Sequence, residues 1–178
     1  SDTYDPNDLG FLSANNSRVG VIYISYRDFN PNNKNLNKIR TSASISNERL
    51  YSPNLYAVTF WETNTMFVTK SFNAGGLSFE GSIGESNDYF EPRGDVIGLD
   101  KFIRPVWTNS RAWVSSNYQK RIAIDAGVNY IDVKRNDWWE WSYDLEFRFR
   151  INNQINLIHG FRKSFQYNSE GYAVSFAE

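Results

Sequence analysis

The chain of 178 residues lacks cysteine altogether and contains one histidine and one methionine. Without cysteine there can be no disulfide bond, no thiolate metal site and no cysteine nucleophile. The single histidine, His159, has no second ligand of its kind with which to hold a metal ion. We therefore expect no metal and no other cofactor, and we expect His159 to have a structural or interfacial role. No catalytic residue is assigned.

Charge of one sign is not in excess, because 19 basic residues stand against 20 acidic ones and the net charge is -1. Such a balance gives no reason to expect a nucleic-acid partner. Long apolar runs are also missing, since no segment approaches the roughly 20 residues that a membrane helix needs. The mean hydropathy is -0.57. A membrane-spanning sheet stays open as an interpretation, because alternating strands average to a neutral hydropathy.

Aromatic residues, in contrast, make up 17% of the chain, and one aromatic-rich run has a strict period of two. Its apolar residues are Trp139, Trp141, Tyr143, Leu145, Phe147, Phe149 and Ile151. The residues between them are Glu140, Ser142, Asp144, Glu146, Arg148 and Arg150. Since successive side chains on a strand point to opposite faces, this run predicts a strand with one apolar and one charged face.

The same period recurs along almost the whole chain and predicts about nine strands and no helix. The predicted strands are Arg18 to Phe29, Lys38 to Tyr51, Asn54 to Val68, Ser71 to Glu85, Pro105 to Tyr118, Arg121 to Val133, Trp139 to Ile151, Gln154 to Phe165 and Gly171 to Ala177. Residues 86–104 form a long irregular stretch, which we expect to be an extracellular loop. Toward the C-terminus, short and longer connections are expected to alternate, as in membrane barrels.

A sheet with one apolar and one charged face occurs in soluble proteins and in transmembrane barrels. The predicted strands, of about 10 to 14 residues, exceed the usual five or six of soluble strands and are long enough for tilted membrane strands. We therefore predict an all-β fold, an antiparallel up-and-down transmembrane β-barrel, in which residues 1–178 form a single domain. Bacterial single-chain barrels have even strand numbers, so an odd count predicts a segment of a larger barrel that does not fold alone.

Three groups of residues are candidates for functional sites. The charged face of the strand quoted above would line a barrel lumen with Glu140, Asp144, Glu146, Arg148 and Arg150. The aromatic cluster at its start would meet the lipid headgroups with Trp139, Trp141 and Tyr143, next to Trp138. The long loop combines carboxylates and aromatic rings, as sugar-binding sites do, in Asp88, Tyr89, Phe90, Glu91 and Arg93. A loop held by its own Glu91 and Arg93 charges and by ring contacts is the favoured interpretation of these residues, and sugar binding is the alternative.

Several short motifs resemble those of one family of uncharacterised bacterial outer-membrane proteins. The motifs are N-D-L-G-F-L (Asn7 to Leu12) followed by Asn15 and Asn16, E-R-L-Y-S-P-N (Glu48 to Asn54), N-D-Y-F-E-P-R (Asn87 to Arg93), S-S-N-Y-Q-K-R (Ser115 to Arg121) and N-S-E-G-Y (Asn168 to Tyr172). They span nearly the whole chain, and D-Y-F-E-P-R is the most specific. By this resemblance, members of that family consist of a secretion signal, a carbohydrate-binding module of the family-nine type and a long C-terminal barrel. The resemblance implies that this chain is an internal part of the barrel.

The resemblance further implies a place in the bacterial outer membrane, with the lipid bilayer and other outer-membrane or periplasmic proteins as partners. We expect a structural or transport role, or a role within an envelope complex, with a link to glycans. The alternative is a soluble β-sandwich or barrel that binds a carbohydrate or another small ligand. An enzyme of glycan breakdown would need two carboxylates in one cleft, and nothing in the sequence favours it over binding.

Overall fold

The computed structural model describes residues 17–50, 54–88, 102–134, 137–152 and 154–168. These residues form ten β-strands and no helix. The strands are β1 (Ser17–Asp28), β2 (Leu36–Leu50), β3 (Tyr56–Thr69), β4 (Ala74–Ser82), β5 (Ser86–Asp88), β6 (Phe102–Arg104), β7 (Trp107–Ser115), β8 (Ile122–Val133), β9 (Trp138–Arg150) and β10 (Asn156–Tyr167).

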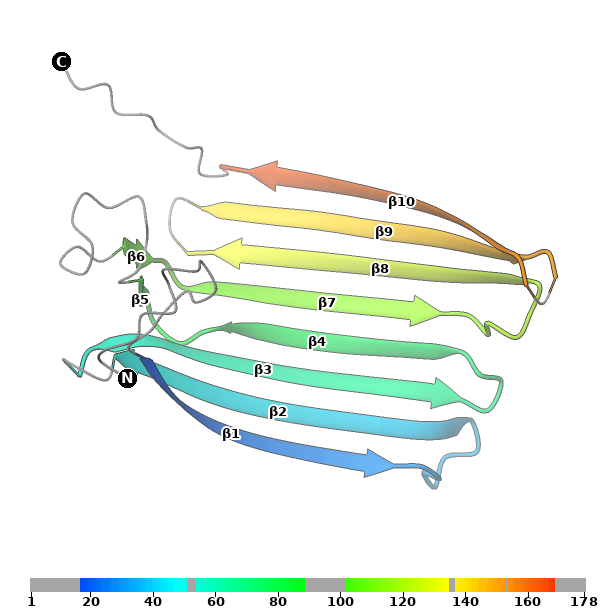
Figure 1. Cartoon of the computed structure of the whole chain (residues 1–178), viewed down its shortest axis with the longest axis horizontal. Coiled ribbons are helices and arrows are strands. Elements are labelled where there is room, and N and C mark those ends of the chain that lie inside the picture. The colour runs from blue at the N-terminus through cyan, green and yellow to red at the C-terminus, as the bar shows by residue number, and fades with distance from the viewer. Residues whose placement is uncertain (1–16, 51–53, 89–101, 135–136, 153, 169–178) are drawn as a thin grey trace, which may run out of the picture.

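The long strands form one eight-stranded sheet in the order β1-β2-β3-β4-β7-β8-β9-β10 (Figure 1). All neighbours are antiparallel, and each long strand pairs with the next long strand along the chain. The short strands β5 and β6 pair with each other in a separate two-stranded sheet. The prediction of an all-β, antiparallel, up-and-down fold is confirmed.

Eight of the predicted strands are present, with ends that differ by a few residues, and Gly171 to Ala177 lies outside the described residues. The connections differ from expectation in two respects. The stretch 86–104 begins and ends with the paired strands β5 and β6, each too short for a period of two to be visible in the sequence. Residues 134–137 form a shorter connection than 116–121 or 151–155, whereas the sequence predicted a longer one there, so the predicted order of short and longer connections is wrong.

Residues directly opposite each other on antiparallel strands lie on the same face. The pairing register therefore extends the same two faces across the whole sheet. We name the face with Trp139, Tyr143 and Phe147 of β9 the apolar face, and the face with Glu140, Asp144 and Arg148 the polar face. One row of the apolar face consists of Tyr26, Thr41, Thr65, Leu77, Ala112, Val128, Tyr143 and Lys163. A single alternation therefore extends from β1 to β10.

Exposure is inverted relative to a soluble sheet. Every exposed large hydrophobic residue of the six inner strands lies on the apolar face: Ile45, Leu77, Phe79, Val114, Ile122, Ile124, Val128, Trp141, Tyr143 and Phe149. The polar face instead holds buried small side chains, namely Ser42, Ser82, Ala123, Val133 and Ser142. Leu50 and Ala57, which are also buried, lie beside the irregularity where β2 and β3 meet. The described residues thus leave the apolar face uncovered.

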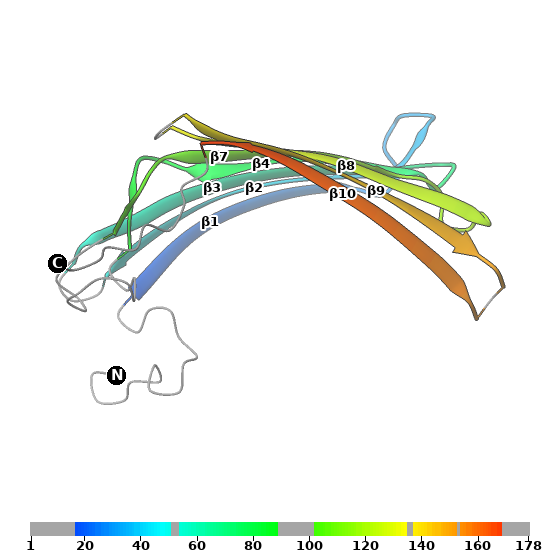
Figure 2. The same cartoon turned by 90° about the horizontal axis from the view of Figure 1, so that it is seen from above.

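The sheet is arched (Figure 2). Side chains converge on the inner side of an arch and spread apart on its outer side, so the buried serines indicate that the polar face is the inner one. The described residues do not close into a barrel, because none of them pairs with the outer edges of β1 and β10. Both edge strands are exposed over nearly their whole length.

The connections 29–35, 70–73, 116–121 and 151–155 lie together at one end of the strands, which we name the turn rim (Figure 1). The first three are joined by hydrogen bonds. The backbone N of Lys70 donates to Asn35 O at 3.0 Å. Asn117 donates from its backbone N to Asn73 Oδ1 at 2.9 Å and from Nδ2 to Ser71 O at 2.8 Å. The opposite end, with connections 51–55, 83–106 and 134–137, is the loop rim.

Gly81 in β4 approaches the neighbouring strand so closely that it has no room for a methyl group. A Cβ at this position would lie 2.5 Å from the backbone oxygen of Trp107. Because backbone would have to move, we expect Gly81→Ala to lower the free energy of unfolding of the natural protein by about 1–3 kcal/mol. Gly160→Ala in β10 is the control, since nothing lies within 4 Å of the added Cβ. Urea unfolding in detergent measures both, and equal midpoints would contradict the close approach.

Candidate functional site

The polar face is the candidate functional site, because a continuous row of polar side chains crosses it. One complete row, the neutral row, consists of Ser25, Ser42, Asn64, Ser78, Arg111, Asn129, Ser142 and Ser164. All of its members carry hydrogen-bonding groups, and all except Arg111 are uncharged. Hydroxyl and amide groups in such a row favour contact with water or a polar solute over packing in an apolar core.

Charged residues flank the neutral row with different signs on its two sides. The row toward the loop rim contains the acidic residues Glu62, Glu80 and Glu140. Glu62 and Glu80 lie directly opposite each other, and Asn109 Nδ2 donates to Glu80 Oε1 at 2.9 Å. The row toward the turn rim contains Arg27, Arg40, Asp144 and Arg162. The polar face is therefore of mixed sign, with its acidic and basic residues displaced along the strands.

A compact ionic cluster surrounds Arg148 at the turn-rim end of the polar face. Its Nε lies 3.0 Å from Asp125 Oδ2, and its Nη2 lies 2.6 Å from Glu146 Oε1. The register places Asp125 of β8 directly opposite Glu146 of β9, so the two carboxylates would repel each other. The Arg148 guanidinium, two residues along the same face, bridges them and offsets that repulsion.

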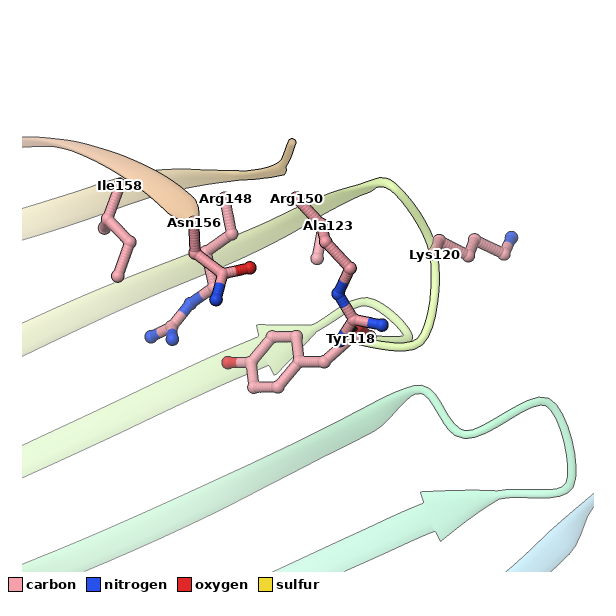
Figure 3. A pocket seen from close by; sticks show the side chains of 7 residues that line it. All are labelled: Tyr118, Lys120, Ala123, Arg148, Arg150, Asn156 and Ile158. Carbon is pink, nitrogen blue, oxygen red and sulfur yellow. Dashed lines mark hydrogen bonds between the residues drawn. The ribbon is translucent and has the colours of Figure 1, made fainter. Parts of the chain in front are cut away.

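Tyr118, in the connection between β7 and β8, folds back over this cluster (Figure 3). The Arg148 guanidinium carbon is 4.7 Å from the centre of the Tyr118 ring, which is a cation–π distance. The Tyr118 hydroxyl donates to Asp125 Oδ1, and the Tyr118 carbonyl accepts from Arg150 Nη2 at 2.9 Å. Burial, together with the hydrogen bond to Asp125, raises the pKa of the Tyr118 phenol. The phenol therefore stays protonated and remains a donor at neutral pH.

A hollow of about 200 Å³ opens beside the cluster. It is lined by Tyr118, Lys120, Ala123, Arg148, Arg150, Asn156 and Ile158 (Figure 3). This volume is below the roughly 300–1,000 Å³ of pockets that enclose small-molecule ligands. The Lys120 side chain extends away from the other six residues. The hollow is thus a small polar notch at the rim, and the extended polar face is the larger feature.

All five residues predicted to line a lumen lie on the polar face: Glu140, Asp144, Glu146, Arg148 and Arg150. Glu140 accepts a hydrogen bond from Gln166 Nε2 at 2.8 Å, and the Asp144 carboxylate lies over Gly127. That this face lines a lumen stays a prediction. Tyr118 was missed, because a loop side chain that folds back over a strand leaves no periodic signal in the sequence.

The residues predicted to lie at the membrane interface, Trp139, Trp141 and Tyr143, share the apolar face. Ring contacts link them to neighbouring strands: Trp141 lies 4.5 Å from Tyr130 and Trp139 lies 5.8 Å from Tyr167, between ring centres. Their contact with a membrane stays a prediction. Trp138 does not belong to the cluster, because it pairs with Val133 and faces the polar side.

The loop candidates Tyr89, Phe90, Glu91 and Arg93 lie outside the described residues. Asp88 is the last residue of β5, and its backbone pairs with that of Phe102 in β6. His159 lies on the apolar face opposite Phe147, as its spacing from Leu157 and Phe161 predicts. The described ranges contain no group of three or more His, Asp or Glu that could hold a metal ion. They also contain no helix long and apolar enough to cross a membrane.

These features define an all-β protein built on one large antiparallel up-and-down sheet with a polar and an apolar face. The chain belongs to a family described as a domain of unknown function, DUF5916, which matches residues 1–178. No curated protein and no solved structure matched the chain. The outer-membrane location and the neighbouring carbohydrate-binding module, which the motifs implied, stay predictions.

We expect Arg148→Met to lower the free energy of unfolding by about 1–2 kcal/mol, because Asp125 and Glu146 would then face each other without a cation. The loss stays below that of a fully buried pair, since the Arg148 side chain is 40% exposed. Tyr118→Phe keeps the ring and removes one hydrogen bond, so we expect the free energy of unfolding to fall by about 1 kcal/mol.

The matched control for both variants is Arg162→Met. Arg162 lies on the same face in β10 and has no hydrogen bond or ion pair with any described residue. Urea titration of the natural protein in detergent measures all three variants. A loss in the control as large as in Arg148→Met would show that the charge on this face matters and the cluster geometry does not.

Proposed function

We propose that the sheet is part of a transmembrane β-barrel of a bacterial outer membrane, with the apolar face against lipid and the polar face toward the interior. The observation that carries the proposal is the inverted exposure, in which large hydrophobic side chains are exposed on one face and small polar ones are buried on the other. A half-solvated soluble sheet shows the reverse. An apolar surface of this width needs a cover, and lipid chains provide one.

The dimensions of the apolar face fit a bilayer. On β9 this face is continuous from Trp139 to Phe149. At about 3.3 Å per residue the run is about 33 Å long, and a strand tilt of about 40° reduces its height to about 25 Å. Membrane barrels have an outer apolar band of this height. Trp139 and Tyr167 lie opposite each other on neighbouring strands near the loop rim, where an aromatic girdle would meet the headgroups.

Charged residues on the apolar face lie near the strand ends, where a membrane-spanning strand tolerates charge. On the inner strands only Arg49 and Asp132 are charged there, and each is second from the end of its strand. Charge is costly at mid-depth and nearly neutral at the interface. Lys163 on the edge strand β10 is the exception. Its Nζ lies 4.8 Å from the centre of the Phe165 ring, so the side chain extends toward the loop rim.

The polar face suits a hydrated interior. Two buried atoms on this face, Asn109 Oδ1 and Trp138 Nε1, have no hydrogen-bond partner among the described residues. Glu146 Oε1 also lacks a hydrogen bond but has the ion pair with Arg148. Buried polar atoms of this kind are normally satisfied by water. These atoms and the neutral row support an interior that passes a polar solute or binds another component of an envelope complex.

The proposal requires further strands, because a bilayer does not tolerate the unpaired edges of β1 and β10. It also gives an orientation. The connection 83–106 is the longest between neighbouring strands of the sheet and lies at the loop rim. Long connections of outer-membrane barrels are extracellular, so the loop rim faces outward and the turn rim faces the periplasm. The link to glycans stays a prediction, since its loop residues lie outside the described ranges.

Adjacent residues of β4 offer a matched test of the two faces. Leu77 lies at mid-depth on the apolar face, and Ser78 lies beside it on the polar face. We expect Leu77→Arg to make folding into a bilayer less favourable by about 2–4 kcal/mol. Ser78→Arg should cost much less, because water in the proposed interior screens its charge from Arg111, which lies directly opposite in β7. Heat-modifiable gel mobility of the natural protein measures the folded fraction, and equal losses would contradict the assignment of faces.

Single cysteines provide the direct experiment, since this chain has none of its own. In vesicles that contain the natural protein with any cysteine outside this chain replaced, a water-soluble maleimide should label Ser78→Cys and Asn129→Cys. Fluorophores attached at Leu77→Cys and Val128→Cys before reconstitution should be quenched by brominated lipids. If the protein instead fractionates without detergent and lipids quench no position, the soluble sandwich that binds a small ligand replaces the barrel.

A further inference from the structure

Cations gather at the turn rim without acidic residues beside them in the connections. The four connections contain Lys34, Lys70, Lys120 and Arg121, and no Asp or Glu. All four basic side chains are exposed. The loop rim differs, because Glu85, Asp88 and Asp137 accompany Arg104 and Lys134 in its described connections. The positive charge of the turn rim is therefore not neutralised within its own turns.

Large apolar side chains are exposed between these cations. Phe29 is 68% exposed, Phe72 is 50% exposed and Ile151 is 65% exposed, each in a different connection. Phe72 has a φ of 62°, a left-handed conformation that is rarely adopted by a bulky residue. The turn holds it there, with the Phe72 N donating to Thr69 O at 2.9 Å. The turn rim thus pairs positive charge with exposed apolar surface.

The hydrogen bonds between turns fix the spacing of these groups. The bond from Lys70 N to Asn35 O brings Lys70 beside the turn that carries Lys34. The bonds from Asn117 to Ser71 and Asn73 join the turn that carries Lys70 to the turn that carries Lys120. The three lysines therefore lie on one connected arc of backbone, which reduces the entropy lost when they bind a common surface.

We propose that the turn rim binds the phosphate headgroups of anionic phospholipids in the adjacent leaflet, an inference that rests on the membrane-spanning sheet proposed above. Charge complementarity selects the anionic headgroup, and the exposed apolar side chains select a lipid over a free anion. At a bilayer surface an aromatic ring enters the acyl boundary while a neighbouring ammonium reaches the phosphate. A dissolved phosphate would engage the lysines alone and leave Phe29, Phe72 and Ile151 in water.

The test uses the natural protein reconstituted in phosphatidylcholine vesicles with a trace of spin-labelled lipid. Electron spin resonance measures the association of spin-labelled phosphatidylglycerol with the protein surface relative to spin-labelled phosphatidylcholine. A lysine near an anionic headgroup increases the binding affinity about fivefold. We therefore expect the protein to prefer phosphatidylglycerol over phosphatidylcholine by about that factor. The variant Lys34→Gln/Lys70→Gln/Lys120→Gln should lower the preference to about one, and added salt should lower it in the unmodified protein.

The control neutralises three cations near the loop rim, Arg18→Gln, Arg49→Gln and Lys134→Gln, and should keep the preference. Equal preferences in the turn-rim variant and the unmodified protein would overturn the inference. An absence of preference in the unmodified protein would overturn it as well, while immobilised phosphatidylcholine in the same spectra would still support the membrane-spanning sheet. If no lipid of either kind is immobilised, the proposed function itself fails.

Discussion

The two-residue period of the strand, held in register over eight strands, is the constraint on which the rest of this structure depends. A shift of one residue in any pair would move every side chain of that strand to the other face. Ser78 would then join the apolar face and Leu77 the neutral row. The irregularities in the β2–β3 pairing occur between Leu36 and Lys38 and between Glu48 and Arg49, at the two ends of β2. The central part of that pairing is therefore undisturbed.

Glycine supports the polar face by leaving room for larger neighbours. A Cβ on Gly76 would lie 2.7 Å from Trp113 Nε1, and one on Gly127 would lie 2.7 Å from Asp144 Oδ1. The indole and the carboxylate can therefore lie flat along the sheet and do not project from it. Together with the small residues of the neutral row, this keeps the inner side of the arch shallow. A shallow inner face would suit the barrel interior proposed above, because it leaves room for a polar solute.

The sequence predicted the fold well where the alternation is strict. From Ile122 to Tyr130 on β8 and from Trp139 to Phe149 on β9, the alternation in the sequence matches the two faces of the structure. On β1 Val19, Val21 and Tyr23 are apolar yet lie on the polar face, so the faces of this strand became clear only from its pairing with β2. Edge strands are exposed on both sides, and their composition is less constrained by either environment.

The candidate site was predictable only as far as it is periodic. The lumen candidates of β9 share one face because they are two residues apart, whereas Tyr118 joins them through a turn. Trp138 and Trp139 are adjacent and look equivalent in the sequence. They point to opposite faces because both lie within β9. That β9 already begins at Trp138 follows from the turn before it, in which Asp137 has a φ of 50°, and from the pairing of Trp138 with Val133. Turn geometry of this kind depends on contacts between strands that a single sequence does not reveal.

The hydrogen bonds between neighbouring turns also bear on how such a protein can diverge. Lengthening the connection 70–73 by one residue would displace both the Lys70 contact with Asn35 and the Asn73 contact with Asn117. The three turns therefore cannot drift in length independently, and an insertion in one requires compensation in the others. Inherited variation in length is expected to accumulate away from this rim, so that the turn rim keeps its outline while the loop rim acquires new shapes.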